Sequence, residues 1–346
     1  MEIFEKLECL NGVDTDLNHV QRENYLLFCS NIKRCVGKEG TVDMFKRLFF
    51  AEHVGDMYDT CHAPIMTCKN GNVEVGTPCI FATMHYGPYK AIGRYLLSRG
   101  ISLCVPVTQK VYDTQKDSFE QSLSDLVDDR TNLVFVNVEK RSGLISLFKY
   151  VRFGYSLLIY LDGNSGIGGM SRDDEKLEDF HFFYETIKIR KGVQFLSDKL
   201  SLDVKPILAT LGDVCNKEPY IELFPTISSR KCRIRDMWSF FCEYMKNDIA
   251  QWEGWCYVNS FFKYKHNEVK VTTSSEPIKR FNCERYDFVI TDTLYLYDKA
   301  NSTKVKLSKG LFDLLYTLYS HDCSIDVSNI GKPMLALDLQ KSQILI

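Results

Sequence analysis

The amino-acid sequence predicts an α/β fold, with a mostly parallel central sheet flanked by helices, a helical N-terminal segment and a small α+β C-terminal domain. The main observation is that short apolar runs alternate with helix-like segments over residues 76–265, as they do in βαβ units. The pattern changes on either side of this region, and a polar stretch at 266–284 is typical of a linker. We therefore expect three parts, at residues 1–75, 76–265 and 284–346.

The individual elements follow from hydrophobic spacing. Residues 24–28 and 42–50 place apolar side chains at helical intervals, which predicts helices in the N-terminal segment. The short apolar runs predict strands at 79–84, 102–107, 133–137, 156–161 and 204–209. Helices are expected between and after them at 89–99, 115–128, 142–153, 190–200 and 237–253. In the tail, we expect strands at 288–290 and 294–297 and a helix at 308–319.

Composition limits the class of protein. The chain has 346 residues, 45% of them hydrophobic, which is enough for a sizeable core, and its net charge of -2 gives no basic field for nucleic acid. The 13 cysteines include no CxxC pair, so we expect reduced thiols in a cytoplasmic protein and no metal site. The acidic N-terminus predicts no signal peptide, and no apolar stretch is long enough to predict a transmembrane segment.

Two polar residues directly follow predicted strands. His85 follows the strand at 79–84, and Asp162 follows the strand at 156–161. Parallel sheets carry their chemistry at the carboxyl ends of strands, and an imidazole titrates near neutral pH, so His85 is a candidate general base. Gly87 lets the backbone approach a ligand closely. The alternative is a histidine that is hydrogen-bonded only for structural reasons.

The surroundings of His85 point to a family. Met84-His85-Tyr86-Gly87-Pro88 resembles the His-Phe-Gly block of the bacterial lipid A late acyltransferases (the lauroyl and myristoyl transferases). These belong to the lysophospholipid acyltransferase superfamily, whose signature is H-x4-[DE]. Further blocks follow in the family's order, including Phe182-Phe183-Tyr184-Glu185-Thr186 and Gln251-Trp252-Glu253-Gly254-Trp255. The resemblance covers about residues 75–265.

The resemblance implies acyl transfer from a thioester donor, carried by acyl carrier protein or CoA, to an amine, hydroxyl or peptide acceptor. It implies no cofactor beyond this phosphopantetheine-borne co-substrate, and a place in lipid or natural-product biosynthesis. One position departs from the family, because the motif acid is replaced by Lys90. A like charge there would disfavour the imidazolium form of His85. The candidates for a substitute acid are Asp162, Glu139 and Glu185.

Several other residues are candidates for binding substrate. Arg141 could grip a phosphate, and the remaining candidates are Gly87, Lys90, Gly163 and Arg190. Two alternatives to an acyltransferase stay open. A non-catalytic acyl-binding or scaffold protein could keep the fold without the acid, and a thioester hydrolase would use water as the acceptor.

The tail carries a second resemblance. Leu294-Tyr295-Leu296-Tyr297-Asp298 and the segment 304–315 are similar to small winged-helix peptide-recognition modules, which implies a peptide or carrier-bound acceptor as a possible partner. A packing extension is the alternative. Peripheral contact of the aromatic N-terminal helices with a membrane surface also stays open.

Overall fold

The computed structural model describes residues 19–163, 175–212, 218–263, 278–290, 293–300, 303–320 and 324–346. The chain divides into two compact units, which we describe separately. The larger unit is Arg34–Lys263, and the smaller unit combines the residues up to Lys33 with those from Tyr264 onward. This division differs from the predicted one, because residues 34–75 cluster with the α/β region and not as a separate segment.

The larger unit is built on a seven-stranded sheet in the order β1-β9-β8-β2-β5-β3-β4. Neighbouring strands are parallel, as predicted, except that β9 runs antiparallel to β8. The central strands are apolar on both faces because helices cover both. The strands are β1 (Thr67–Cys68), β2 (Ile80–Thr83), β3 (Leu103–Val107), β4 (Leu133–Asn137), β5 (Ser156–Tyr160), β8 (Val204–Thr210) and β9 (Tyr220–Leu223).

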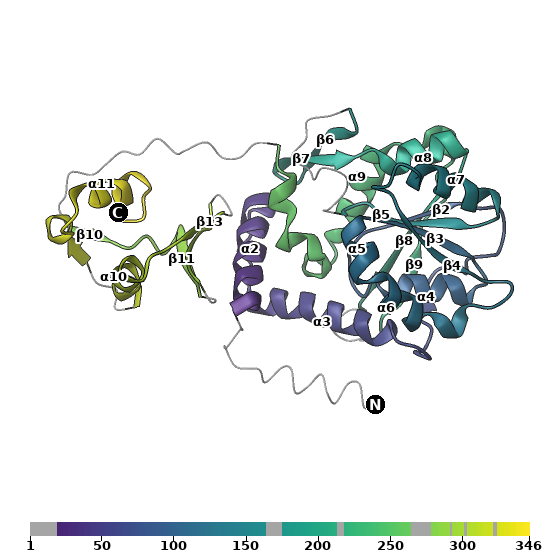
Figure 1. Cartoon of the computed structure of the whole chain (residues 1–346), viewed down its shortest axis with the longest axis horizontal. Coiled ribbons are helices and arrows are strands. Elements are labelled where there is room, and N and C mark those ends of the chain that lie inside the picture. Colours follow the sequence, from purple (N-terminus) through teal and green to yellow (C-terminus); the bar gives the residue numbers. More distant parts are fainter. Residues whose placement is uncertain are drawn as a thin grey trace. The chain divides into compact units, whose positions relative to one another are not determined.

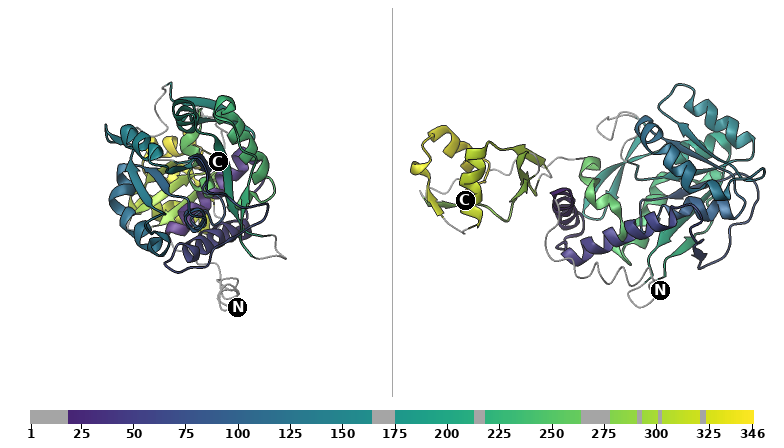
Figure 2. Two further views of the ribbon diagram at one scale, coloured as in Figure 1. Left: turned by 90° about the vertical axis from the view of Figure 1, so that its right-hand side faces the viewer. Right: turned by 60° about the horizontal axis from the view of Figure 1, so that its bottom comes forward.

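Helices flank this sheet on its two faces (Figures 1 and 2). The crossover from β2 to β3 and the crossover from β4 to β5 run in opposite directions across the sheet. Since such crossovers are right-handed, their helices α4 and α7 lie on opposite faces. The helices of this unit are α3 (Val42–Tyr58), α4 (Ala91–Ser98), α5 (Gln109–Thr114), α6 (Lys116–Ser122), α7 (Gly143–Arg152), α8 (Gly192–Leu200) and α9 (Ile234–Met245).

Two predicted helices have different bounds in the structure. In place of one helix at 115–128 there are α5, α6 and the 3-10 turn η1 (Ser124–Leu126), because the Thr108 hydroxyl caps an earlier start and the chain breaks at Gln115, with φ -127°. The helix expected at 237–253 ends at Met245. Beyond Met245 the chain forms three 3-10 turns in place of regular helix: η3 (Ile249–Gln251), η4 (Glu253–Cys256) and η5 (Val258–Phe261). The rings of Trp252 and Trp255 in this segment are buried.

An antiparallel hairpin that the prediction did not include stands apart from the main sheet. It consists of β6 (Leu177–Phe182) and β7 (Glu185–Arg190). Along β7, Ile187 and Ile189 are buried while their neighbours are partly exposed, which is the two-residue period of a strand. The helix predicted at 190–200 consequently begins only at Gly192.

The smaller unit combines short antiparallel strands with helices. A three-stranded antiparallel meander packs on α10, and its core includes Phe288, Leu296 and Leu315. Leu26 of α2 (His19–Val36) packs against Val289 and Tyr297 of this meander. The elements are β10 (Ile278–Arg280), β11 (Tyr286–Ile290), β12 (Leu294–Asp298), β13 (Thr303–Lys306), α10 (Lys309–Ser320), β14 (Ser324–Asp326), η6 (Val327–Asn329) and α11 (Pro333–Lys341). Within the described parts of both units, no helix is long and apolar enough to span a bilayer.

Candidate active site

Strand register brings His85 and Asp162 together. In the parallel pair β2–β5, Thr83 lies opposite Tyr160, and the Leu161 amide donates to the Thr83 carbonyl at 2.8 Å. Each polar residue stands two positions beyond its member of this pair, so the two side chains emerge side by side at the carboxyl edge of the sheet. The apolar runs that build two adjacent buried strands therefore also place the dyad.

The two side chains form a hydrogen-bonded pair. The Nδ1 atom of His85 lies 2.8 Å from Oδ1 of Asp162, and the backbone N–H of His85 lies 3.2 and 3.1 Å from the two carboxylate oxygens. The Asp162 side chain is fully buried, whereas that of His85 is 24% exposed. Because Nδ1 is engaged by Asp162, Nε2 is the ring nitrogen that remains for a substrate.

Two further donors hold Asp162 from the other side. The indole Nε1 of Trp252 donates to Oδ2 at 2.7 Å, and the Tyr257 hydroxyl donates to the same oxygen at 3.4 Å. A buried carboxylate with this many donors stays in place and ionised. Asp162, which orients His85, is thus itself held in place by hydrogen bonds from Trp252 and Tyr257.

The electrostatics of the pair favour an Asp162 carboxylate beside a basic imidazole. Burial disfavours the imidazolium form of His85, but the Asp162 carboxylate outweighs it and raises the pKa of His85 above its ordinary value. Burial likewise opposes ionisation of Asp162, but His85 and the hydrogen bonds from Trp252 and the His85 backbone outweigh it and lower the pKa of Asp162. The arrangement suits a base that is strengthened by its partner.

Aromatic rings line the imidazole. Tyr160 stacks on the His85 ring with 4.7 Å between centroids, and Tyr89 contacts it edge-on at 4.7 Å. Burial raises the pKa of both phenols, and of Tyr257, so all three stay protonated at neutral pH. These rings reduce the access of water to His85 and restrict its rotation.

The turn after His85 is held by residues 251–253, where η3 ends and η4 begins. The Gly87 amide donates to the Gln251 carbonyl at 2.9 Å, and the Glu253 amide donates to the His85 carbonyl at 2.9 Å. Gly87 has φ +59°, and a Cβ there would lie 2.3 Å from the Ala209 carbonyl oxygen. Glycine is therefore required at this position by the packing of the turn, and its N–H is already engaged within the protein.

Lys90 stands where the resembled acyltransferases have their acid, and its charge lowers the pKa of His85 without outweighing Asp162. Its amine forms an ion pair with Asp56 of α3. Lys90 stands at the start of α4, where the chain turns away from the strand end. Asp162, which reaches His85 from the neighbouring strand, occupies the position that a substitute acid requires.

The other predicted site residues lie elsewhere or contact other groups. Glu139 is exposed and accepts a hydrogen bond from the Gln109 amide, at the beginning of α5. Glu185, on β7, forms an ion pair with Arg34 at 2.9 Å. Of the predicted carboxylates, Asp162 is the one bonded to His85. Among the predicted binding residues, Arg141 is exposed before α7, Arg190 is half-buried at the end of β7, and Gly163 directly follows Asp162.

Sequence reasoning missed the residues that surround the dyad. Trp252 was included in a block of the family resemblance but was given no role, and Tyr89, Tyr160 and Tyr257 were not assigned to the site. Tyr160 could have been found, since it is the last residue of the strand that precedes Asp162. Nothing in the local pattern around Trp252 indicates that its indole reaches a carboxylate 90 residues away.

A cavity of about 590 Å³ lies at the opposite edge of the sheet. It is lined by residues at the amino ends of β2 and β8, among them Pro78, Cys79 and Asp203. Because His85 and Asp162 lie at the carboxyl edge, this cavity does not contain the dyad. Comparison with known proteins adds no relative, since no family model and no curated protein sequence matches this chain.

Proposed function

We propose that this chain is an acyltransferase that moves an acyl group from a thioester, on acyl carrier protein or CoA, to an amine, hydroxyl or peptide acceptor. The observation that carries the proposal is the His85–Asp162 pair, with a 2.8 Å hydrogen bond at the carboxyl edge of a mostly parallel sheet. The order of sequence blocks that resembles the lipid A late acyltransferases supplies the reaction class. Phosphopantetheine is part of the donor in this proposal and not a resident cofactor.

The proposed reaction uses His85 as the base. Nε2 accepts the proton of the acceptor's O–H or N–H group while the acceptor atom attacks the thioester carbonyl. The new C–O or C–N bond forms, the C–S bond breaks, and the leaving thiolate takes the proton back from the imidazolium. Asp162 stabilises that imidazolium and fixes its tautomer, which is the role of the aspartate in hydrolase triads. Arg141 is our candidate for holding a donor phosphate.

The departure at Lys90 does not count against this proposal. A family acid on the helix after the histidine and an acid on the neighbouring strand can both reach the same imidazole. Asp162 carries the full set of contacts expected of an orienting carboxylate, and Lys90 is paired with Asp56. We therefore infer that Asp162, which follows β5, serves as the orienting acid in place of an acid at position 90, and that His85 is still the base.

The test is release of free thiol from acyl carrier and acyl-CoA donors, with the acylated product followed by mass spectrometry. We expect His85→Ala to abolish transfer, because no other group removes the proton. Lys90→Ala should retain most of the activity, because its amine contacts Asp56. His53→Ala, which replaces an exposed histidine of α3, is the matched control.

Each outcome separates one reading from the others. Thiol release that needs His85 and yields an acylated acceptor supports the proposal. Release without any acylated product would favour a hydrolase, and no release with any donor and acceptor would favour an acyl-binding scaffold. Full turnover by His85→Ala would exclude the role given to that residue.

A further inference from the structure

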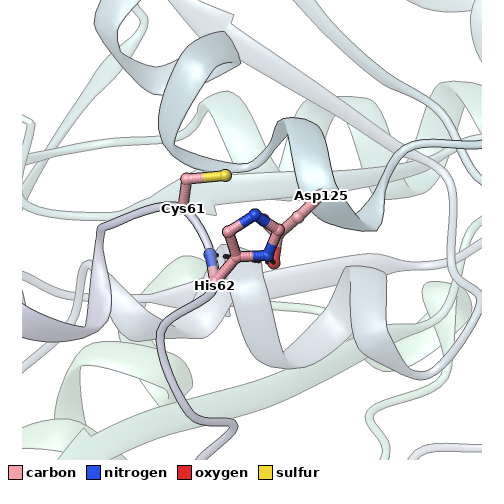
Figure 3. Close-up of side chains that lie close together, drawn as sticks. All are labelled: Cys61, His62 and Asp125. Carbon is pink, nitrogen blue, oxygen red and sulfur yellow. Dashed lines mark hydrogen bonds and ion pairs between the residues drawn. The ribbon is translucent and has the colours of Figure 1, made fainter.

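A second cluster of reactive side chains lies away from the dyad. Cys61 and His62 occupy the turn that follows α3, and Asp125 belongs to η1 (Figure 3). One ligand atom from each of the three side chains lies within 4.8 Å of the others. Thiolate, imidazole and carboxylate are the three side-chain groups from which proteins build zinc sites.

We propose that Cys61, His62 and Asp125 bind one divalent transition-metal ion of the zinc class, with a fourth position open to solvent. Neither the reaction proposed for His85 nor the family resemblance involves these residues. A tetrahedral zinc site needs ligand atoms roughly 3.3–3.8 Å apart. Nδ1 of His62 already lies 3.7 Å from Oδ2 of Asp125.

The Cys61 sulfur and the His62 ring must still move closer to Asp125 for all three to bind one ion, and rotation of these two side chains is enough. Cys61 is exposed, and the His62 side chain is 84% exposed, so neither is held by packing. The Cys61 sulfur contacts the Ser124 hydroxyl at 3.7 Å, which points it toward η1, the element that carries Asp125. Metal binding would replace this weak contact and release the thiol proton to solvent.

Arg94 holds Asp125, the proposed anionic ligand, in a fixed orientation. The Arg94 guanidinium binds both carboxylate oxygens, with Nη1 at 3.0 Å from Oδ1. Arg94 is itself 2% exposed, and its Nε donates to the Ala63 carbonyl at 2.8 Å. The carboxylate is therefore oriented by a buried cationic partner. Because Oδ2 also accepts the His62 N–H, Oδ1 is the oxygen that keeps a lone pair for a metal ion.

The backbone at His62 also favours the cluster. His62 has φ +63°, a left-handed backbone conformation that is unfavourable for a residue with a Cβ. Its N–H donates to Asp125 Oδ2 at 3.0 Å. The turn is thus held in a strained form that keeps His62 beside Asp125, and a metal ion there would link the end of α3 to η1.

The experiment is titration of the full chain with Co²⁺ and Zn²⁺ under a phosphine reductant. We expect one Co²⁺ per chain, with an absorption band for thiolate-to-metal charge transfer, and its displacement by Zn²⁺. Cys61→Ser should remove the band, and His62→Gln should lower the affinity at least about tenfold. The matched controls are Cys283→Ser and His53→Gln, which replace an exposed thiol and an exposed imidazole outside the cluster.

Because Cys61 and His62 are exposed, the variants at these two positions should fold. Thermal unfolding without metal checks this. Zn²⁺ should raise the unfolding temperature of the wild type and of both controls, but not that of Cys61→Ser. The same Co²⁺ spectrum from wild type and Cys61→Ser would overturn the site. So would the absence of a charge-transfer band from the wild type at saturating Co²⁺.

Discussion

At the scale of single residues, the site depends on one carboxylate that makes several contacts at once. Asp162 binds the His85 ring through Oδ1 and accepts from the Trp252 indole through Oδ2, and the backbone N–H of His85 lies within hydrogen-bond distance of both oxygens. The same group therefore sets the tautomer, the orientation and the basicity of the imidazole. A residue with this many contacts is best tested by a change that keeps its shape.

Asp162→Asn should lower the maximum transfer rate by about 10²–10⁴-fold, as loss of the orienting acid does in hydrolase triads. The pH profile should change as well. In the wild type the carboxylate raises the pKa of His85, so transfer should require a pH above the ordinary histidine value. Without the carboxylate, burial and the Lys90 charge lower the pKa of His85 against the weaker opposing effect of Glu253. The acidic limb of the profile, along which the rate rises as His85 loses its proton, should therefore move to lower pH.

Rates measured between pH 5 and 9 check this prediction, with Asp129→Asn, at an exposed loop position, as the control. Near-ultraviolet circular dichroism tests whether the variant keeps its packing around the buried tryptophans. A correctly packed Asp162→Asn protein with wild-type rate and profile would contradict the orienting role.

The sequence predicted the two residues of the dyad but not what surrounds them. His85 and Asp162 were accessible because each follows a recognisable apolar strand, and parallel pairing of those strands makes them neighbours. Glu139 and Glu185 were equally plausible acids, since a one-dimensional pattern does not specify which carboxylate faces an imidazole. Their partners, Gln109 and Arg34, depend on long-range packing.

At the scale of elements, the turn after β2 determines where His85 points. It enters a left-handed conformation at Gly87 and is fastened to the segment 251–253 by backbone hydrogen bonds. This turn explains why residue 87 is glycine, where the sequence pattern predicts close approach of the backbone to a ligand. Its first role is to let the turn pass against the Ala209 carbonyl.

Gly87→Ala should therefore destabilise the larger unit by more than about 3 kcal/mol, since a Cβ 2.3 Å from a backbone oxygen forces the chain to move. Gly154→Ala is the matched control, because Gly154 has φ +92° but open space around its Cβ position. That change should cost only about 1 kcal/mol. Urea unfolding of both variants measures the difference, and equal losses would show that the carbonyl contact is not important.

The strands were predicted better than the helices, and for a physical reason. Each parallel strand is a short buried run whose apolar residues are visible directly in the sequence. Helix ends depend on caps and on competing tertiary contacts, which a local pattern does not show. Helix α9 thus ends at Met245, and the segment after it is not a regular helix but buries the rings of Trp252 and Trp255. The hairpin β6–β7 was missed because its period-two pattern is short and alternates isoleucine with charged residues.

At the scale of the whole molecule, the proposed site is surrounded by acidic groups that make folding depend on pH. Glu52 of α3 is the strongest case. Burial, with the nearby Glu253 carboxylate as the next cause, raises the pKa of Glu52 to about 7. Lys90 opposes this shift without cancelling it. Asp162 behaves in the opposite way, because its pKa is lowered in the folded protein.

The two groups affect stability with opposite signs. Since Asp162 has a lowered pKa, it contributes stability above its unfolded pKa, and this is lost as the pH falls through the folded value. Glu52 has a raised pKa, so the folded state binds more protons than the unfolded state between about 4.5 and 7. Stability is therefore lost as the pH rises through that window, and the full cost is on the order of 3 kcal/mol.

Glu52→Gln removes this cost, so we expect the variant to unfold at higher urea concentration than the wild type at pH 8, with a much smaller difference at pH 5. The window follows from the raised pKa alone, because at pH 5 the folded wild type keeps Glu52 protonated and uncharged like the amide. Glu74→Gln, at an exposed position, should show no such dependence on pH. A Glu52→Gln protein that is less stable at pH 8 would mean that the ionised carboxylate is stabilised by its surroundings, and that burial does not dominate at this position.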